Sequence, residues 1–252
     1  MKNDFKNWAD VYSIIYNQRF ENDDEFLFYQ SFLDEADGPI LEMACGTGRL
    51  YTKFLEDGYN IHGSDISEAM LQKTRQKCEE KGLTPTLYHG DSKDISIDTT
   101  FSLIYYPFSS LQHLNEGIEV QKQTFQNIYD HLEEGGTFVF DLPVPSFEYV
   151  TENYGELQEE FVVEDGVQYK IETWSEISNE AEMNCDLTER VINTETNTII
   201  YESTFELALL PKQQVELLLQ VVGFSTYQIH PGYDRDSEFT DANSRMCFVA
   251  KK

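Results

Sequence analysis

The stretch Ile40-Leu41-Glu42-Met43-Ala44-Cys45-Gly46-Thr47-Gly48-Arg49-Leu50 decides the fold. Its first four residues read as a short buried strand, which runs directly into a glycine-rich turn and then a helix expected over Gly48–Glu56. Glycines let the backbone pass close beneath a ligand, and the first turn of a helix offers unpaired N–H groups. The stretch therefore predicts a strand–turn–helix unit that binds a ligand at its turn.

Strands and helices alternate after this unit. Further strands are expected at Asn60–Ser64, Leu87–His89, Phe101–Tyr106 and Thr137–Leu142, with helices from Ser67 to Gly82 and from Ile118 to Gly135-Gly136. Because such alternation demands parallel strands and right-handed crossovers, we expect a doubly wound α/β sheet covered on both faces. A helix at Lys212–Val222 and strands at Phe224–His230 and Met246–Ala250 would complete a mostly parallel seven-stranded sheet with an antiparallel C-terminal strand.

A different pattern begins after Pro143. Strands are expected at Glu159–Glu164, Val167–Ser175, Ala181–Ile192 and Thr198–Leu209, with a hairpin signal at Asp165-Gly166. We therefore divide the chain into an N-terminal helical cap (1–37), a main domain (38–150 and 210–252) and an inserted antiparallel β meander (151–209). The meander, with Trp174, would line a pocket or form a dimer contact, which leaves a homodimer open.

The chain is strongly acidic. Its 252 residues include 46 Asp and Glu against 18 Lys and Arg, a formal net charge of −28. Such a field repels DNA and RNA, so we expect no nucleic-acid partner. No apolar run is long enough to cross a bilayer and the N-terminus lacks a signal-peptide core, so we expect no membrane contact and a cytoplasmic location. The four cysteines lie far apart without metal-ligand spacing, so we expect no metal site.

Acidic residues lie at or near the ends of the first three expected strands. Asp65 ends the second strand 19 residues after Gly46, where a carboxylate can accept from both hydroxyls of a ribose, and Asp91 after the third strand can accept from an adenine amino group. A dinucleotide fold would want a further glycine at position 51, where this chain has Tyr51. S-adenosylmethionine (SAM) carries a carboxylate and an ammonium instead of phosphates, and Glu42 suits that chemistry. The pattern predicts a SAM site, with a nicotinamide-dependent oxidoreductase, NAD(P)-linked, as the alternative.

Four segments carry a family resemblance. LEMACGTG, GSDISEAML, YHGDSKDI and LEEGGTFVFDLP resemble the SAM-binding motifs of class I, Rossmann-like methyltransferases. The resemblance covers residues 38–145 and 210–250, and the stretch PFSSLQHL with the β meander is similar to small-molecule N-methyltransferases, including sugar N,N-dimethyltransferases. It implies a methyltransferase that transfers the methyl group of SAM to a small-molecule acceptor, an amine, by in-line displacement. A SAM-binding module without catalysis is a further alternative.

The resemblance also implies a set of cofactor-binding residues. It places Ala44, Gly46 and Gly48 under the methionyl group, Glu42 at its ammonium through water, Asp65 on the ribose, Ile66 and Met70 beside the adenine, Asp91 and Ser92 at the adenine edge, and Tyr16 with Arg19 over the cofactor. The chain departs from the family pattern at the first glycine of the turn, which is Ala44 here. We expect this methyl group to be tolerated.

Two residues are candidates for the chemistry. His113 follows the fourth expected strand, and histidine near neutral pH would orient or deprotonate an acceptor, although a structural role is the alternative. Tyr12, like Tyr16, Tyr106 and Phe108, would stack on adenine or face the sulfonium charge, although helix packing explains Tyr12 and Tyr16 equally well. We assign His113 and Tyr12 to catalysis and Phe108 to the cofactor site as predictions.

Overall fold

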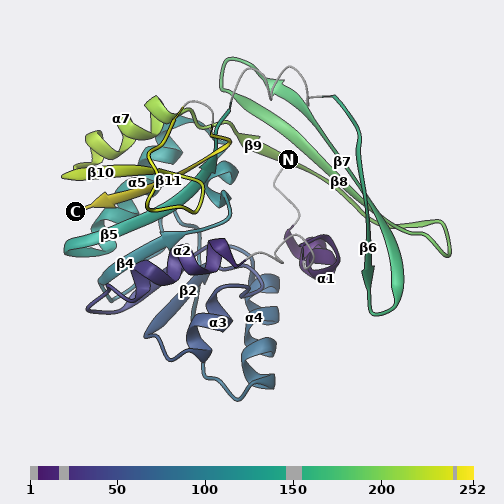
Figure 1. The fold of residues 1–252 in the computed structure, drawn as a ribbon, viewed down its shortest axis with the longest axis horizontal. Coiled ribbons are helices and arrows are strands. Elements are labelled where there is room, and N and C mark those ends of the chain that lie inside the picture. The colour runs from purple at the N-terminus through teal and green to yellow at the C-terminus, as the bar shows by residue number, and fades with distance from the viewer. Residues whose placement is uncertain (1–4, 17–22, 146–154, 241–242) are drawn as a thin grey trace.

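The computed structural model describes residues 5–16, 23–145, 155–240 and 243–252. In that part of the chain a large α/β layer structure stands beside a long, smaller sheet, and helix α1 (Phe5–Tyr16) lies between them (Figure 1). No helix in the described ranges is long and apolar enough to span a membrane.

The larger sheet has seven strands in the order β10-β11-β5-β4-β1-β2-β3. Their bounds are β1 Ile40–Met43, β2 Ile61–Asp65, β3 Thr86–His89, β4 Phe101–Tyr106, β5 Leu132–Pro143, β10 Thr226–Pro231 and β11 Arg245–Lys251. Strands β1 to β5 pair in parallel, whereas β11 runs antiparallel to both β5 and β10. The predicted mostly parallel sheet with an antiparallel C-terminal strand is confirmed.

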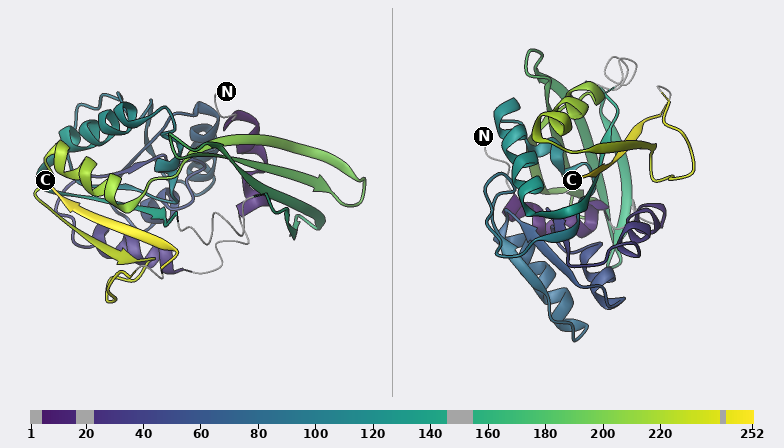
Figure 2. Two further views of the ribbon diagram at one scale, coloured as in Figure 1. Left: turned by 90° about the horizontal axis from the view of Figure 1, so that it is seen from above. Right: turned by 90° about the vertical axis from the view of Figure 1, so that its left-hand side faces the viewer.

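Helices cover both faces of this sheet (Figure 2). They are α2 Asp24–Leu33, α3 Tyr51–Glu56, α4 Glu68–Glu80, α5 Ile118–His131 and α7 Lys212–Val222. Side chains alternate across a strand, so Tyr105 of β4 packs with Phe28 of α2 on one face while Ile104 packs with Phe125 of α5 on the other. The doubly wound architecture is therefore confirmed, and both faces of the central strands are buried.

The smaller sheet is an antiparallel meander in chain order. It contains β6 Gln158–Glu164, β7 Val167–Asn179, β8 Asn184–Asn193 and β9 Thr198–Ala208. Asp165 and Gly166 both have positive φ (51° and 79°), which suits the tight hairpin that joins β6 to β7. Helix α1 buries Val11 and Ile15 against this sheet, and it also contacts α4, where Lys73 pairs with Asp10 at 2.9 Å. The meander and α1 thus form one wall opposite the larger sheet.

Several predicted element boundaries are wrong. Strand β7 extends to Asn179 rather than Ser175, and β8 begins at Asn184 rather than Ala181, because residues 181–183 belong to the turn between them. Helix α3 begins at Tyr51 rather than Gly48, because Gly46 and Gly48 are left-handed (φ 56° and 75°) and continue the turn. Helix α5 ends at His131, and Gly135-Gly136 lies inside β5 instead of closing the helix. A Cβ at Gly136 would come within 2.9 Å of the Glu133 carbonyl oxygen, so these glycines permit the irregular start of the strand.

Candidate active site

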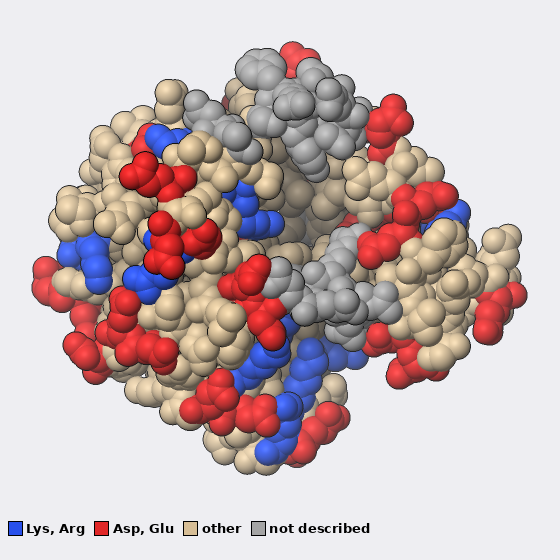
Figure 3. Space-filling view, viewed as in Figure 1, with Lys and Arg blue, Asp and Glu red and all other residues tan. Residues whose placement is uncertain are grey.

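A cavity of about 1120 Å³ opens at the carboxyl ends of the parallel strands. The strand ends and the β1–α3 turn form one wall, and α1, the 3₁₀ helix η2 (Ser110–His113) and strands β7 to β9 form the facing wall. Figure 3 shows the surface hollowed between the two parts of the molecule, with acidic side chains spread over both. Open α/β sheets bind their ligands at this edge.

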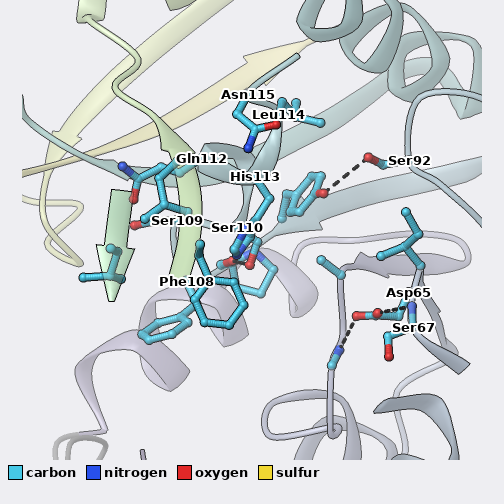
Figure 4. A pocket seen from close by; sticks show the side chains of 18 of the residues that line it. Asp65, Ser67, Ser92, Phe108, Ser109, Ser110, Gln112, His113, Leu114 and Asn115 are labelled. Atoms are coloured by element: carbon cyan, nitrogen blue, oxygen red, sulfur yellow. Dashed lines mark hydrogen bonds between the residues drawn. The ribbon is translucent and has the colours of Figure 1, made fainter. Parts of the chain in front are cut away.

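Asp65 joins the first two strand ends. Its Oδ2 accepts the Gly46 N–H at 2.8 Å and its Oδ1 accepts the Ser67 N–H at 2.7 Å (Figure 4). The residue is 8% exposed, and burial raises the pKa of its carboxyl to about 6, although both backbone donors oppose the rise. Each carboxylate oxygen keeps a second lone pair, so a fixed Asp65 can also accept from two neighbouring hydroxyls.

Glu42 and Arg49 place opposite charges near the glycine turn. Glu42 is 2% exposed and accepts the Tyr105 hydroxyl at 2.5 Å, and burial raises the pKa of its carboxyl to about 8. Arg49 lines the cavity and pairs with Glu25 at 2.6 Å; the neighbouring acids outweigh burial and raise the pKa of its guanidinium. A permanent cation and an ionisable acid at one end of a cavity match the zwitterionic end of an amino acid.

The turn itself divides into lining and packing residues. Ala44 and Gly46 line the cavity, whereas Gly48 is not among its lining residues. A Cβ at Gly48 would lie 2.7 Å from Cγ2 of Thr74 and 2.8 Å from Oγ1 of Thr52, so this glycine lets α3 and α4 pack closely. At Gly46 a Cβ would meet only the Ala44 carbonyl oxygen at 4.0 Å, which leaves the backbone there open to a ligand.

The predicted adenine end of the cavity is assembled at the ends of β2 and β3. Ile66, Met70, Asp91 and Ser92 all line it, and Ile66 is exposed. Asp91 forms an ion pair with Lys93 at 3.0 Å, a partner that the sequence pattern did not indicate. The other carboxylate oxygen of Asp91 accepts the backbone N–H of Lys93 at 3.1 Å. An adenine amino group that binds here would therefore share the Asp91 carboxylate with Lys93.

The facing wall carries the candidates for chemistry. Figure 4 shows His113 across the cavity from Asp65, together with Phe108, which was predicted for the cofactor site. Burial lowers the pKa of His113 to about 4, so its ring is neutral near pH 7, and it lies edge-on to Phe205 with centroids 6.0 Å apart. Burial raises the pKa of Tyr12 to about 12, and Tyr12 also lines the cavity. Arg19 lies outside the described residues.

The meander contributes residues that sequence reasoning missed. Glu189 of β8 is 1% exposed, lines the cavity and accepts the Tyr16 hydroxyl at 2.9 Å. Thr173 of β7 faces it across the strand pair, and its buried Oγ1 has no partner. Trp174, predicted with the meander to wall the pocket, is not among the lining residues; its ring lies 5.1 Å from the Arg190 guanidinium. The sequence feature that could have identified Glu189 is a glutamate at an inward-facing position among the apolar residues of a strand.

Three non-glycine residues beside the cavity have left-handed backbones. They are Ala44 (φ 52°), Phe108 (φ 58°) and Ser109 (φ 55°). Each costs roughly 1–3 kcal/mol and persists only where the surroundings hold it, and such strain gathers at functional sites. Ala44 therefore fits the turn, at a cost that glycine would avoid.

The residue at position 51 distinguishes a SAM site from a dinucleotide site. Tyr51 is fully buried and its hydroxyl accepts the Thr86 N–H at 2.9 Å, so a core tyrosine stands where a dinucleotide fold needs glycine. Among the described residues no group of three or more His, Cys, Asp and Glu is arranged to hold a metal. Residues 40–136 match the family model of a methyltransferase domain. This part of the chain therefore matches a methyltransferase domain, and the residues at its strand ends fit SAM as the cofactor.

Several known proteins are similar to this chain. YqeM of Bacillus subtilis, named as a methyltransferase, is 27% identical over 219 residues, 85% of this chain and 84% of that protein. A protein of Geobacillus sp. (strain WCH70) that is also named as a methyltransferase is 33% identical over 103 residues, 41% of each chain. The dTDP-3-amino-3,4,6-trideoxy-alpha-D-glucopyranose N,N-dimethyltransferase of Streptomyces venezuelae is 30% identical over 138 residues, 53% of this chain and 56% of that one. The last two matches cover less than two thirds of those relatives.

Solved structures share the whole fold. The CcbJ methyltransferase of Streptomyces caelestis superposes with a TM-score of 0.77 at 20% identity, covering 99% of this chain and 98% of that one. DesVI of Streptomyces venezuelae gives 0.74 at 22% identity, with 96% and 97% covered. The coverage includes the meander as well as the larger sheet, so the two-part architecture is common to these proteins.

Proposed function

We propose that the protein transfers the methyl group of SAM to an amine nitrogen of a small molecule. One observation carries the proposal: a single cavity joins the acidic strand ends to a facing wall that holds neutral His113 and buried Glu189. Pockets for drug-sized ligands measure roughly 300–1,000 Å³, so a cavity of about 1120 Å³ has room for a cofactor and a small acceptor. The meander lines this cavity, which favours a pocket wall over a dimer contact as its role.

The residues present fit SAM. Asp65 would accept from the ribose hydroxyls, and Glu42 and Arg49 would face the ammonium and carboxylate of the methionyl end. When bound, SAM supplies an electrophilic methyl group on a sulfonium. In-line transfer requires the acceptor's lone pair to point at that carbon, so the facing wall acts mainly by positioning. An ammonium must lose a proton before attack, and the neutral ring of His113 can accept a hydrogen bond from the resulting amine and orient it.

Charge in the cavity favours a cationic acceptor. The three basic lining residues described, Arg49, Lys93 and Arg245, are each paired with a carboxylate. The chain as a whole carries a formal net charge of −28. Because Arg49 would contact the cofactor's carboxylate, and Lys93 and Arg245 are engaged by acids, the described lining offers no further cation to a phosphate, which suits an amine without a phosphate group. Two relatives are named for dTDP-linked amino sugars, so an amino group on a sugar is the shared feature we carry over.

Isotope transfer tests the function. The protein would be incubated with methyl-deuterated SAM and matched sets of amines, hydroxyl analogues, amino sugars and their dTDP-linked forms, with products read by mass spectrometry. We expect label in amines but not in the matched hydroxyl compounds, and more in the amino sugars than in their dTDP forms. SAM binding without transfer to any amine would leave the non-catalytic module as the correct alternative.

Replacing Arg49 with methionine is expected to weaken binding of S-adenosylhomocysteine, the demethylated cofactor, by about 10-fold or more. Binding of methylthioadenosine, which lacks the amino-acid end, is expected to change less than about 2-fold, because Arg49 would contact only the missing carboxylate. Calorimetric titration measures both. Arg75→Met on α4, an exposed arginine paired with Glu68 at 2.7 Å, is the matched control. Equal losses for both ligands would contradict the assignment.

Glu42 should make the stability of the ligand-free protein fall with rising pH. Burial raises its pKa from 4.5 to about 8, so between these values the folded chain keeps a proton that the unfolded chain has lost. Its contribution is complete below pH 4.5 and is lost as pH rises to about 8. Denaturant titrations at several pH values are expected to show the free energy of unfolding of the wild type falling relative to Glu42→Gln, by at most about 1.4 kcal/mol per pH unit. Parallel curves of the free energy of unfolding against pH for the wild type and Glu42→Gln would refute the raised pKa of Glu42.

A further inference from the structure

The turn between β4 and η2 runs through two consecutive left-handed residues beside the cavity. Phe108 has φ 58° and Ser109 has φ 55°, a region that favours glycine. A pair of larger residues stays there only if neighbouring groups hold the backbone in place. Groups packed around Ser109 must therefore hold this turn.

Asp141, near the carboxyl end of β5, receives the donors of the turn. Its Oδ2 accepts the Ser109 N–H at 3.0 Å and the Ser109 hydroxyl at 3.1 Å, and it also accepts from the Arg245 guanidinium. Arg245 donates in addition to Oγ of Ser109 at 2.8 Å. The other oxygen, Oδ1, accepts the Tyr29 hydroxyl at 2.7 Å. Asp141 is fully buried, so this carboxylate is fixed from both sides.

The same turn places two residues of the candidate active site. The Phe108 ring lies against Tyr16, with centroids 5.3 Å apart, and 5.5 Å from the Arg49 guanidinium. Directly after Ser109, η2 begins, and it ends at His113. Asp141 is not among the residues that line the cavity. Any effect it has on an acceptor must therefore pass through the turn.

We propose that Asp141 is a positioning residue for methyl transfer. By holding the Ser109 backbone in its left-handed conformation, it keeps Phe108 and His113 facing the cavity. The inference rests on the proposed function, because the reaction it serves is the amine methylation described above. Asp65, Glu42 and Arg49 lie on other elements, so cofactor binding should depend on Asp141 only weakly, through the Phe108 ring beside Arg49.

Two variants at Ser109 distinguish the effect of the backbone conformation on kcat from the effect of the hydroxyl group. Ser109→Gly and Ser109→Val both lose Oγ and keep the N–H that Asp141 accepts, but only glycine adopts φ 55° without a clash. We expect Ser109→Gly to keep kcat within about 3-fold, and Ser109→Val to lower it on the order of 10- to 100-fold. The dissociation constant of S-adenosylhomocysteine should stay within about 3-fold in both. Equal kcat values for the two variants would overturn the proposal.

Asp141→Ala tests the same idea from the other side of the hydrogen bonds. It should lower kcat about as much as Ser109→Val, whereas Asp141→Asn, which can still accept the Ser109 N–H, should restore most of it. Tyr29→Phe is the matched control, because it removes a bond to the same carboxylate on the side away from the turn. Assays run well below each unfolding midpoint. A loss in Tyr29→Phe as large as that in Asp141→Ala, or a normal kcat in folded Asp141→Ala, would refute positioning; an inactive wild type would instead count against the proposed function.

Discussion

Replacing Asp65 with alanine is expected to raise the dissociation constant of SAM by at least about 100-fold. A charge-assisted hydrogen bond contributes roughly 1.5–3 kcal/mol, and the variant would lose two such bonds to the ribose hydroxyls. The Gly46 and Ser67 N–H groups would also lose their acceptor, so the cradle would loosen as well. Calorimetric titration with S-adenosylhomocysteine, which cannot react, gives the affinity directly.

Asp94→Ala is the control for Asp65→Ala. Asp94 is an exposed acid after β3 that does not line the cavity, so its removal makes the same change in net charge. Circular dichroism should show that both variants are folded at the assay temperature. In the wild type, affinity should also fall below pH 6, because the ligand-free carboxyl of Asp65 has a pKa of about 6 and its neutral form accepts more weakly. An affinity within about 3-fold of wild type in folded Asp65→Ala would rule out the ribose role.

Replacing His113 with phenylalanine is expected to lower kcat about 100-fold while the affinity for SAM stays unchanged. Phenylalanine keeps a ring against Phe205 and removes the nitrogen that would accept a hydrogen bond from the amine and orient it. Since the pKa of His113 is about 4, the ring is neutral from pH 5 to 8 and its own titration should appear only as a loss of rate toward pH 4. Steady-state rates with saturating amine and SAM measure the effect.

His62→Phe controls for the loss of a partly buried imidazole. His62 lies on β2 next to Tyr88, with Nδ1 3.0 Å from the tyrosine hydroxyl, and it does not line the cavity. Its kcat should remain within about 3-fold of wild type. If folded His113→Phe turns over as fast as this control, then His113 is structural and does not orient the acceptor.

Local patterns were enough to predict most of the fold. The apolar run at Ile40–Met43 and its glycine turn predicted β1 correctly, and the serine at position 67 does cap α4, where its Oγ accepts the Met70 N–H at 3.3 Å. The start of β5 was missed, because Gly135-Gly136 is also a normal helix-ending signal, and only the pairing of Leu132 with Phe101 and of Thr137 with Leu103 shows that the segment is a strand. Such pairing depends on distant segments, which single-sequence periodicity does not contain.

Local patterns predicted some of the site residues, whereas others depend on contacts between distant segments. Residues at strand ends, such as Asp65, Asp91 and Phe108, could be placed together because parallel strands bring their carboxyl ends to one edge. Glu189 could not, since its partner Tyr16 is 173 residues away and the meander's position over the cavity follows from tertiary packing. The ion pair between Lys93 and Asp91 was missed for another reason: a lysine two positions after an aspartate is common in exposed loops and does not indicate an ion pair.

The central claim is that the ends of β1, β2 and β3 together bind the nucleoside and the amino-acid end of one SAM molecule. Equilibrium titration of the ligand-free protein with S-adenosylhomocysteine and, separately, with NAD tests it most directly. We expect one S-adenosylhomocysteine per chain with a dissociation constant below about 1 mM, and no heat of binding with NAD. Saturable NAD binding with no binding of S-adenosylhomocysteine would contradict it.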